Sequence, residues 1–252
     1  MGRGRKIGVS LAVLVVVLVG LLVAVDRVAA YAAERTVARQ AKQELAARQI
    51  TTPNEPDVTV AGFPFLTQVA RDRYDKITIK LRDVTADQVT VPRLDVVATG
   101  VHANARDLIA NHGGQVTADH VTGNAVLDWQ SVKQLIKLSG LNASRMDVTA
   151  DKDGQVTLKA PVTLAGFDTT LVATGRLQAS AGTVQVKISD VSTEGGNLPS
   201  LARTFLNNYK QALSVKVPLP RLPYQLKVQQ ATATPDGLVI TAAADHVPIS
   251  NG

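Results

Sequence analysis

The segment at residues 61–69, Ala-Gly-Phe-Pro-Phe-Leu-Thr-Gln-Val, brings apolar side chains close to cations. Phe63, Phe65 and Leu66 lie within four positions, and Arg71 and Arg73 follow shortly after. This combination suits a phospholipid, because guanidinium groups bind phosphate through charge-assisted hydrogen bonds while acyl chains need apolar contacts. A structural role is the alternative, in which the aromatic side chains plug the end of a sheet at a hairpin corner. The two roles are compatible.

Familiar catalytic motifs are missing from the sequence. It has no G-x-S-x-G elbow, S-x-x-K pair, P-loop or dinucleotide fingerprint, and it has no cysteine. Its four histidines, at positions 102, 112, 120 and 246, do not have the spacing of metal ligands. His120 follows Asp119 directly, but neighbouring strand residues point to opposite faces, so this pair cannot act together without a bulge. We therefore predict no enzyme activity and no metal or cofactor. A hydrolase whose carboxylates are brought together by the fold is the third hypothesis.

Residues 7–25 predict a membrane-crossing helix. These 19 residues include no charged side chain, and as a helix they span about 30 Å, the thickness of the hydrocarbon layer. Basic residues at positions 3, 5 and 6 precede them, which predicts a cytoplasmic N-terminus and an extracytoplasmic bulk of the chain. The alternative is a cleaved signal peptide, because Ala30 and Ala32 form an A-x-A pattern. The apolar run is longer than a signal core, however, and Asp26 and Arg27 follow it, so we expect an uncleaved single-pass anchor.

A second helical pattern runs from about residue 28 to residue 49. Apolar residues recur at helical spacing at positions 30, 33, 37, 41 and 45. The opposite side is charged, and Glu44 and Arg48 have the favourable i, i+4 order. The segment is either a solvated stalk or a helix that packs on the following sheet, and Pro53 and Pro56 end it.

From residue 57 the periodicity changes from 3.6 to two, which is typical of strands. Polar and apolar side chains alternate over residues 76–82. Further strands are predicted at residues 93–103, 115–127, 146–150, 155–164, 169–178, 183–192, 224–231 and 238–244, with short helices at residues 129–138 and 199–213. The fold class is therefore α+β, with an N-terminal transmembrane helix and a mostly antiparallel sheet. We expect an anchor at residues 1–27, a helical stalk or packing helix with a linker at residues 28–56, and one β-rich domain at residues 57–252.

The formal charge of +6 is partly a consequence of the N-terminal basic residues. Without the three that precede the apolar segment, the chain carries 24 basic against 21 acidic residues. Such a small excess does not predict a nucleic-acid partner, which requires a concentrated basic face. It is compatible with an anionic lipid surface.

The run Gly-Phe-Pro-Phe-Leu-Thr-Gln at residues 62–68, which leads into Arg73-Tyr74-Asp75 and an alternating strand, resembles the actinobacterial LmeA-type phospholipid-binding family. The Pro-rich stretch at residues 217–224 and the Pro-Asp-Gly turn at residues 235–237 agree with this resemblance over nearly the full length. The resemblance implies a cell-envelope protein that binds phospholipids without catalysis of its own, with a link to lipoglycan elongation in mycobacterial members. By analogy it implies a curled antiparallel sheet wrapped with a long helix around a lipid-holding groove, as in tubular lipid-binding proteins.

The predicted function is a membrane-anchored, periplasmic-side phospholipid-binding protein of the cell envelope. The residues predicted to contact acyl chains are Phe63, Phe65, Leu66, Ile77, Ile79 and Leu81, and those predicted to contact the headgroup are Arg71, Arg73 and Arg221. The main alternative is an interaction protein that docks on and stabilises an envelope glycosyltransferase. That protein would have a solid core and a large exposed apolar patch.

Overall fold

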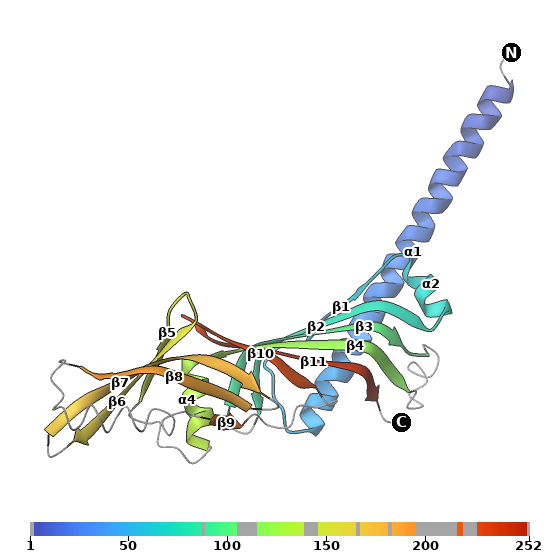
Figure 1. Cartoon of the computed structure of the whole chain (residues 1–252). Coiled ribbons are helices and arrows are strands. Elements are labelled where there is room, and N and C mark those ends of the chain that lie inside the picture. The colour runs from blue at the N-terminus through green and yellow to red at the C-terminus, as the bar shows by residue number, and fades with distance from the viewer. Residues whose placement is uncertain are drawn as a thin grey trace.

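The computed structural model describes residues 3–86, 89–104, 115–138, 146–164, 167–180, 183–194, 216–218 and 226–250. A long N-terminal helix leads into an elongated body that contains two antiparallel sheets (Figure 1). The six-stranded sheet has the order β1-β2-β3-β4-β11-β10, and the five-stranded sheet has the order β5-β6-β7-β8-β9. This architecture confirms the α+β class with mostly antiparallel strands.

The six-stranded sheet begins directly after the long helix and ends with the last strands of the chain. Its members are β1 (Asp57–Ala61), β2 (Arg73–Ala86), β3 (Val89–His102), β4 (Val116–Asp128), β10 (Lys227–Thr234) and β11 (Gly237–Ser250). The five-stranded sheet consists of β5 (Asp147–Ala150), β6 (Gln155–Leu164), β7 (Phe167–Ser180), β8 (Thr183–Thr193) and β9 (Lys216–Pro218). The strand predicted at residues 155–164 agrees at both ends, whereas β9 was not predicted.

The long helix α1 (Arg3–Ala47) is continuous through both predicted helical segments. From Val13 to Val25 its side chains are exposed, and from Asp26 onward one side is buried or half-buried at helical spacing. Ala30 and Ala38 are buried, and the Glu34 Oε1 atom accepts a hydrogen bond of 2.8 Å from the Val60 amide of β1. The second half of α1 therefore packs on the sheet.

Two short helices complete the described fold. The helix α4 (Trp129–Leu138) has the predicted bounds, and Asp128 caps it by accepting a hydrogen bond of 2.7 Å from the Ser131 amide. The helix α2 (Phe65–Ala70) lies where the sequence suggested a hairpin corner. The predicted helix at residues 199–213 and Arg221 lie outside the described residues.

The six-stranded sheet bends along a line that crosses its four central strands. Ala98 and Val101 of β3, like Ala118 and Val121 of β4, are buried in one cluster although each pair is spaced by three residues. Gly100 of β3 lies between such a pair with a φ of +58°, and His246 of β11 has a φ of 53°. In β3 and β11 one left-handed residue inverts the strand alternation, so the apolar side chains on either side of it stay on the same side of the sheet.

The two sheets share a core where β10 lies beside β7. Leu177 of β7 and Trp129 of α4 pack both against the cluster around Leu127 and Leu238 and against the cluster around Val156 and Leu158. Apolar packing is therefore continuous from the six-stranded sheet into the five-stranded one.

Candidate functional site

One face of the six-stranded sheet is apolar across all of its strands, and we call it the apolar face. Ile77, Ile79 and Leu81 of β2 lie on this face, because residues two apart on a strand share a side. Their strand partners continue it in rows across the sheet: Val60, Ile77, Ala98, Val121 and Ala244; Val58, Ile79, Val96, Gly123 and Ala242; Leu81, Leu94, Ala125, Ile240 and Ala231. The register thus brings three of the predicted acyl-contact residues into one surface.

Helices cover the two ends of the apolar face. Ala30 of α1 packs with the row that contains Ile77, and Val132 of α4 packs with Leu127, Leu238 and Ile240 at the other end. In the row between these ends, Ile79 and Val96 are half-buried, whereas Val58, Gly123 and Ala242 are buried.

Gly123 marks an open space in the middle row. Among the described residues, no atom lies within 4 Å of the position that a Cβ atom on Gly123 would occupy. Its neighbours across the strands are Val96 and Ala242, so the space is lined by apolar side chains. Such a space accepts hydrocarbon without any polar group that would need a partner.

The Gly-Phe-Pro-Phe-Leu-Thr-Gln run divides into core and surface residues. Phe65 is buried, with its ring centroid 6.1 Å from that of Tyr74. Phe63 and Leu66 point away from the core, with exposed fractions of 61% and 43%. The six predicted acyl-contact residues therefore do not form one surface, because Phe63 and Leu66 lie outside the sheet core that Phe65 joins.

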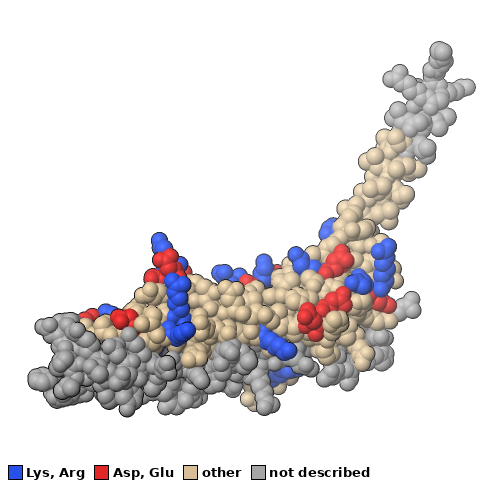
Figure 2. Space-filling model, in the orientation of Figure 1, with Lys and Arg blue, Asp and Glu red and all other residues tan. Residues whose placement is uncertain are grey.

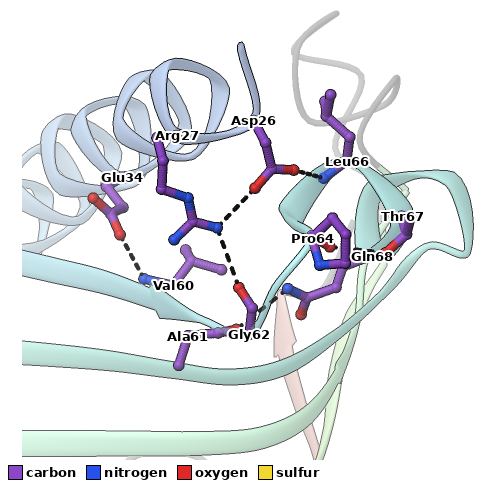
Figure 3. Close-up of polar contacts among 10 residues, drawn as sticks. All are labelled: Asp26, Arg27, Glu34, Val60, Ala61, Gly62, Pro64, Leu66, Thr67 and Gln68. Carbon is purple, nitrogen blue, oxygen red and sulfur yellow. Dashed lines mark hydrogen bonds and ion pairs between the residues drawn. The ribbon is translucent and has the colours of Figure 1, made fainter. Parts of the chain in front are cut away.

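Gln68 has a structural role in this run, which its hydrogen bonds define. Its side chain is buried, donating from Nε2 to the Ala61 carbonyl at 3.3 Å and accepting from the Asp75 amide at 2.9 Å. Gly62 has a φ of +105°, and a Cβ atom there would lie 2.6 Å from Gln68 Nε2. Gln68 and Gly62 therefore fix the connection from β1 through α2 to β2 (Figure 3).

Asp26 and Arg27 connect α1 to this corner, and sequence reasoning treated them only as charges that follow the apolar stretch. The buried Asp26 carboxylate accepts a hydrogen bond of 2.8 Å from the Leu66 amide and lies 2.7 Å from the Arg27 guanidinium (Figure 3). The hydrogen bonds from Arg27 and from the Leu66 amide give this buried carboxylate the partners that a charge removed from water requires. The signal available in the sequence was a charged pair directly at the end of the apolar run.

Two of the predicted headgroup cations, Arg71 and Arg73, lie near the same corner. Arg71 follows α2 and is exposed. Arg73 at the start of β2 is also exposed and lies 3.0 Å from the Asp119 carboxylate, which His102 approaches to 3.6 Å. Arg73 therefore shares its charge with a carboxylate, whereas Arg27 adds a third cation that was not predicted.

The opposite, polar face carries a hydrogen-bonded chain that resembles a catalytic relay. His120 lies 2.6 Å through Nδ1 from the Asp245 carboxylate and 3.0 Å through Nε2 from the Thr122 hydroxyl. The His120 and Asp245 side chains are exposed, and the strand backbone around Thr122 is paired in the sheet with β3 and β11. Serine-type hydrolysis also uses donors aimed at an oxyanion, and the strand amides around Thr122 are already paired within the sheet.

Metal binding has no support in the described part of the chain, where no three metal-ligating side chains lie together. The apolar face remains the surface with the clearest capacity to hold a ligand. Comparison with family models shows which class of protein the chain belongs to. A model described as LmeA-like phospholipid-binding matches residues 24–243. The chain belongs to this family.

The family match covers most of the arrangement described above. The matched region begins two residues before Asp26 and ends within β11, so it includes the corner, five strands of the apolar face and the first part of β11. Neither curated proteins nor solved structures gave a match to the chain.

Proposed function

We propose that this LmeA-like protein is a non-catalytic phospholipid-binding protein of the cell envelope that holds acyl chains on the apolar face. The observation that carries the proposal is the row of Ile79, Val96, Gly123 and Ala242, where apolar side chains surround a space that no described atom fills. Each methylene removed from water contributes about 0.8 kcal/mol, so five buried methylenes contribute about 4 kcal/mol. Useful affinity therefore needs no catalytic group.

In this proposal the protein stays anchored in the cytoplasmic membrane through the first part of α1. One helix in the described chain is long and apolar enough to cross a membrane, with a mean hydropathy of 2.5 in its apolar window. Cleavage after Ala32 would remove Asp26 and Ala30, which contact α2 and the sheet core. This loss supports an uncleaved anchor, and the basic residues before the helix support an extracytoplasmic body.

The headgroup is proposed to lie near Arg71, Arg73 and Arg221, as the sequence suggested. Arg27 joins this proposal because its guanidinium lies at the same corner. A phosphate would compete with the exposed Asp119 for Arg73, which is feasible because a surface ion pair contributes little free energy.

A supporting role in lipoglycan assembly follows from the resemblance to LmeA-type proteins, and docking on an envelope glycosyltransferase is the alternative. The docking hypothesis requires a large exposed apolar patch. Among the described residues outside α1, the exposed large hydrophobic side chains are Phe63 and Leu66. Two side chains are a small area for a stable protein interface, which favours lipid binding.

The test fills the space above Gly123. We expect Gly123→Leu to fold, because a leucine side chain there meets no described atom within 4 Å of its Cβ, and to reduce phospholipid uptake. Native mass spectrometry of the full chain released from membranes, followed by lipid extraction, measures bound phospholipid. Gly20→Leu is the matched control, because Gly20 of α1 also has no described atom within 4 Å of that position.

Two outcomes would reject the proposal. The first is a wild-type protein that carries no phospholipid and takes none up from vesicles. The second is a folded Gly123→Leu variant that binds as much lipid as Gly20→Leu. The first outcome would favour the docking hypothesis, and the second would move the acyl chains away from the middle of the apolar face.

A further inference from the structure

Phe63 and Leu66 have an exposure that the apolar face does not explain. In the described chain, every other large hydrophobic side chain with comparable exposure belongs to α1. Two exposed apolar side chains on one short segment are costly in water unless an apolar phase covers them.

Three contacts fix this segment to one point of α1. The Asp26 carboxylate accepts the Leu66 amide hydrogen at 2.8 Å, and Arg27 donates to the Gly62 carbonyl at 3.5 Å. The Arg27 guanidinium also lies 5.1 Å from the centroid of the Phe63 ring. Phe63 and Leu66 therefore keep a fixed position relative to Asp26 and Arg27, as Figure 3 shows for the Leu66 and Gly62 contacts.

That point of α1 is the end of its exposed apolar surface. Side chains from Val13 to Val25 are exposed, and burial against the body begins at Asp26. Figure 2 shows the described part of the projecting helix without charged side chains, and charged side chains where it meets the body. If the apolar part of α1 lies in a bilayer, the bilayer surface lies at Asp26 and Arg27, because one residue adds only about 1.5 Å of helix length.

We infer that Phe63 and Leu66 enter the interfacial layer of the same bilayer that α1 crosses, as a second attachment beside the helix. This inference rests on the proposed membrane anchor. A lipid surface covers Phe63 and Leu66, because these two side chains lie beside the end of the exposed apolar surface of α1. Arg27 lies between this surface and the charged part of the body, at the depth of lipid phosphates.

The second attachment has a consequence for lipid binding. A single helix leaves a domain free to rotate about the helix axis, whereas a second contact beside it restricts that rotation. The body would then lie at a fixed inclination to the membrane. The apolar face would therefore keep one orientation toward the lipids of the leaflet that Phe63 and Leu66 enter.

The absence of cysteine from the chain gives a direct test. Single-cysteine variants Phe63→Cys and Leu66→Cys, made in the full chain and labelled with an environment-sensitive fluorophore, are reconstituted in phosphatidylcholine and phosphatidylglycerol vesicles. A nitroxide-labelled lipid with its spin label close to the headgroup reports contact by quenching. Leu18→Cys within α1 reports the anchor, and Lys152→Cys, in the exposed turn before β6, reports a site away from the bilayer.

We expect a blue shift and quenching at positions 63 and 66, and neither at position 152. A lipid-dependent blue shift at position 18 without quenching at positions 63 and 66 would overturn the second attachment and leave the anchor in place. Absence of the blue shift at position 18 as well would overturn the anchor itself. Both test positions are exposed, so a label fits without disturbing the core, and each reports independently of the other.

Discussion

The two faces of the six-stranded sheet are made by the same strands but differ in the polar groups that they carry and in the space beside them. The polar face carries the recognisable chemical groups, including His120, Asp245 and the ion pair of Arg73 with Asp119. The apolar face has no such group in its central rows, and it has an open space at Gly123. His120 pairs with Asp245 and Arg73 pairs with Asp119, whereas the apolar face gains free energy only when something covers it.

Reactive residue types are therefore a poor guide to the proposed lipid-binding site in this fold. The Thr122, His120 and Asp245 chain has the order of a catalytic relay, yet it lies on open strand surface. The residues proposed to contact acyl chains are mainly valines, isoleucines and a glycine. They can do so because they lie on the same side of the sheet. Four predictions test the comparison of the two faces.

The largest effect is expected from placing a charge in the covered part of the apolar face. Val101 is 1% exposed, and Val101→Asp would bury a carboxylate without a partner, which we expect to cost more than about 4 kcal/mol of unfolding free energy. Thr99→Asp, two residues away on the same strand but opposite His120 on the polar face, should stay within about 0.5 kcal/mol of wild type. Urea denaturation measures both. Equal losses would mean that the two faces are equally buried.

A charge at a half-buried position in the middle row of the apolar face should affect lipid binding more than stability. Ile79 is half-buried, so Ile79→Asp can fold with its carboxylate turned to water. Loss of two methylene contacts to an acyl chain should lower phospholipid affinity by about tenfold or more. Thr78→Asp on the polar face is the control and should bind like wild type in a vesicle-uptake assay. Unchanged binding by a folded Ile79→Asp variant would place the lipid elsewhere.

A hydroxyl group costs free energy on a surface that excludes water and little on a surface that water reaches, so it can distinguish the two faces. Val96→Thr places it on the apolar face and Val97→Thr on the polar face, at nearly the same size as valine. With lipid bound, we expect Val96→Thr to cost about 1 kcal/mol and Val97→Thr less than about 0.5 kcal/mol. Thermal unfolding in the presence of vesicles gives both values. A Val96→Thr cost as small as that of Val97→Thr would show a hydrated apolar face.

The smallest effect concerns the polar face at low pH. The hydrogen bond with His120 holds the pKa of Asp245 below its usual value. A lowered folded-state pKa stabilises the fold above the unfolded-state pKa of about 3.9, and this contribution is lost as the pH falls through the folded-state pKa. Asp245→Asn should therefore flatten the acid side of the stability profile slightly, with lipid uptake unchanged, because the pair is exposed. Denaturation curves between neutral and acidic pH, with Asp236→Asn as control, measure it. A loss of lipid uptake would show that the polar face takes part in binding.

Sequence periodicity predicted most of the strands but not the bend or the second sheet. The two-residue alternation of β2 and the capped helix after Asp128 are local properties, so both were readable without tertiary information. The spacing of three between Ala98 and Val101 depends on the left-handed backbone of Gly100, which inverts the alternation and breaks the pattern. The helix α2 was missed because its six residues are too few to show a helical period.

The part of the candidate site that depends on local strand geometry could be predicted from the sequence, and the part that depends on distant contacts could not. Ile77, Ile79 and Leu81 share a face by strand geometry alone. Phe63, Phe65 and Leu66 looked alike in sequence, but the contacts of Gly62, Gln68 and Asp26 turn Phe65 inward and the other two outward.

The sequence by itself determined the helix that can cross a membrane, the β-rich class and the family, because these depend on composition, period and local motifs. Only the tertiary structure shows that Gly123 lies beside an open space in an apolar row and that Asp26 joins α1 to α2. Both depend on pairings between residues far apart in the chain, such as Gly123 with Ala242 and Asp26 with Leu66. Local sequence contains no signal for such pairings, since the register of a whole sheet and the packing of a helix on it are settled together.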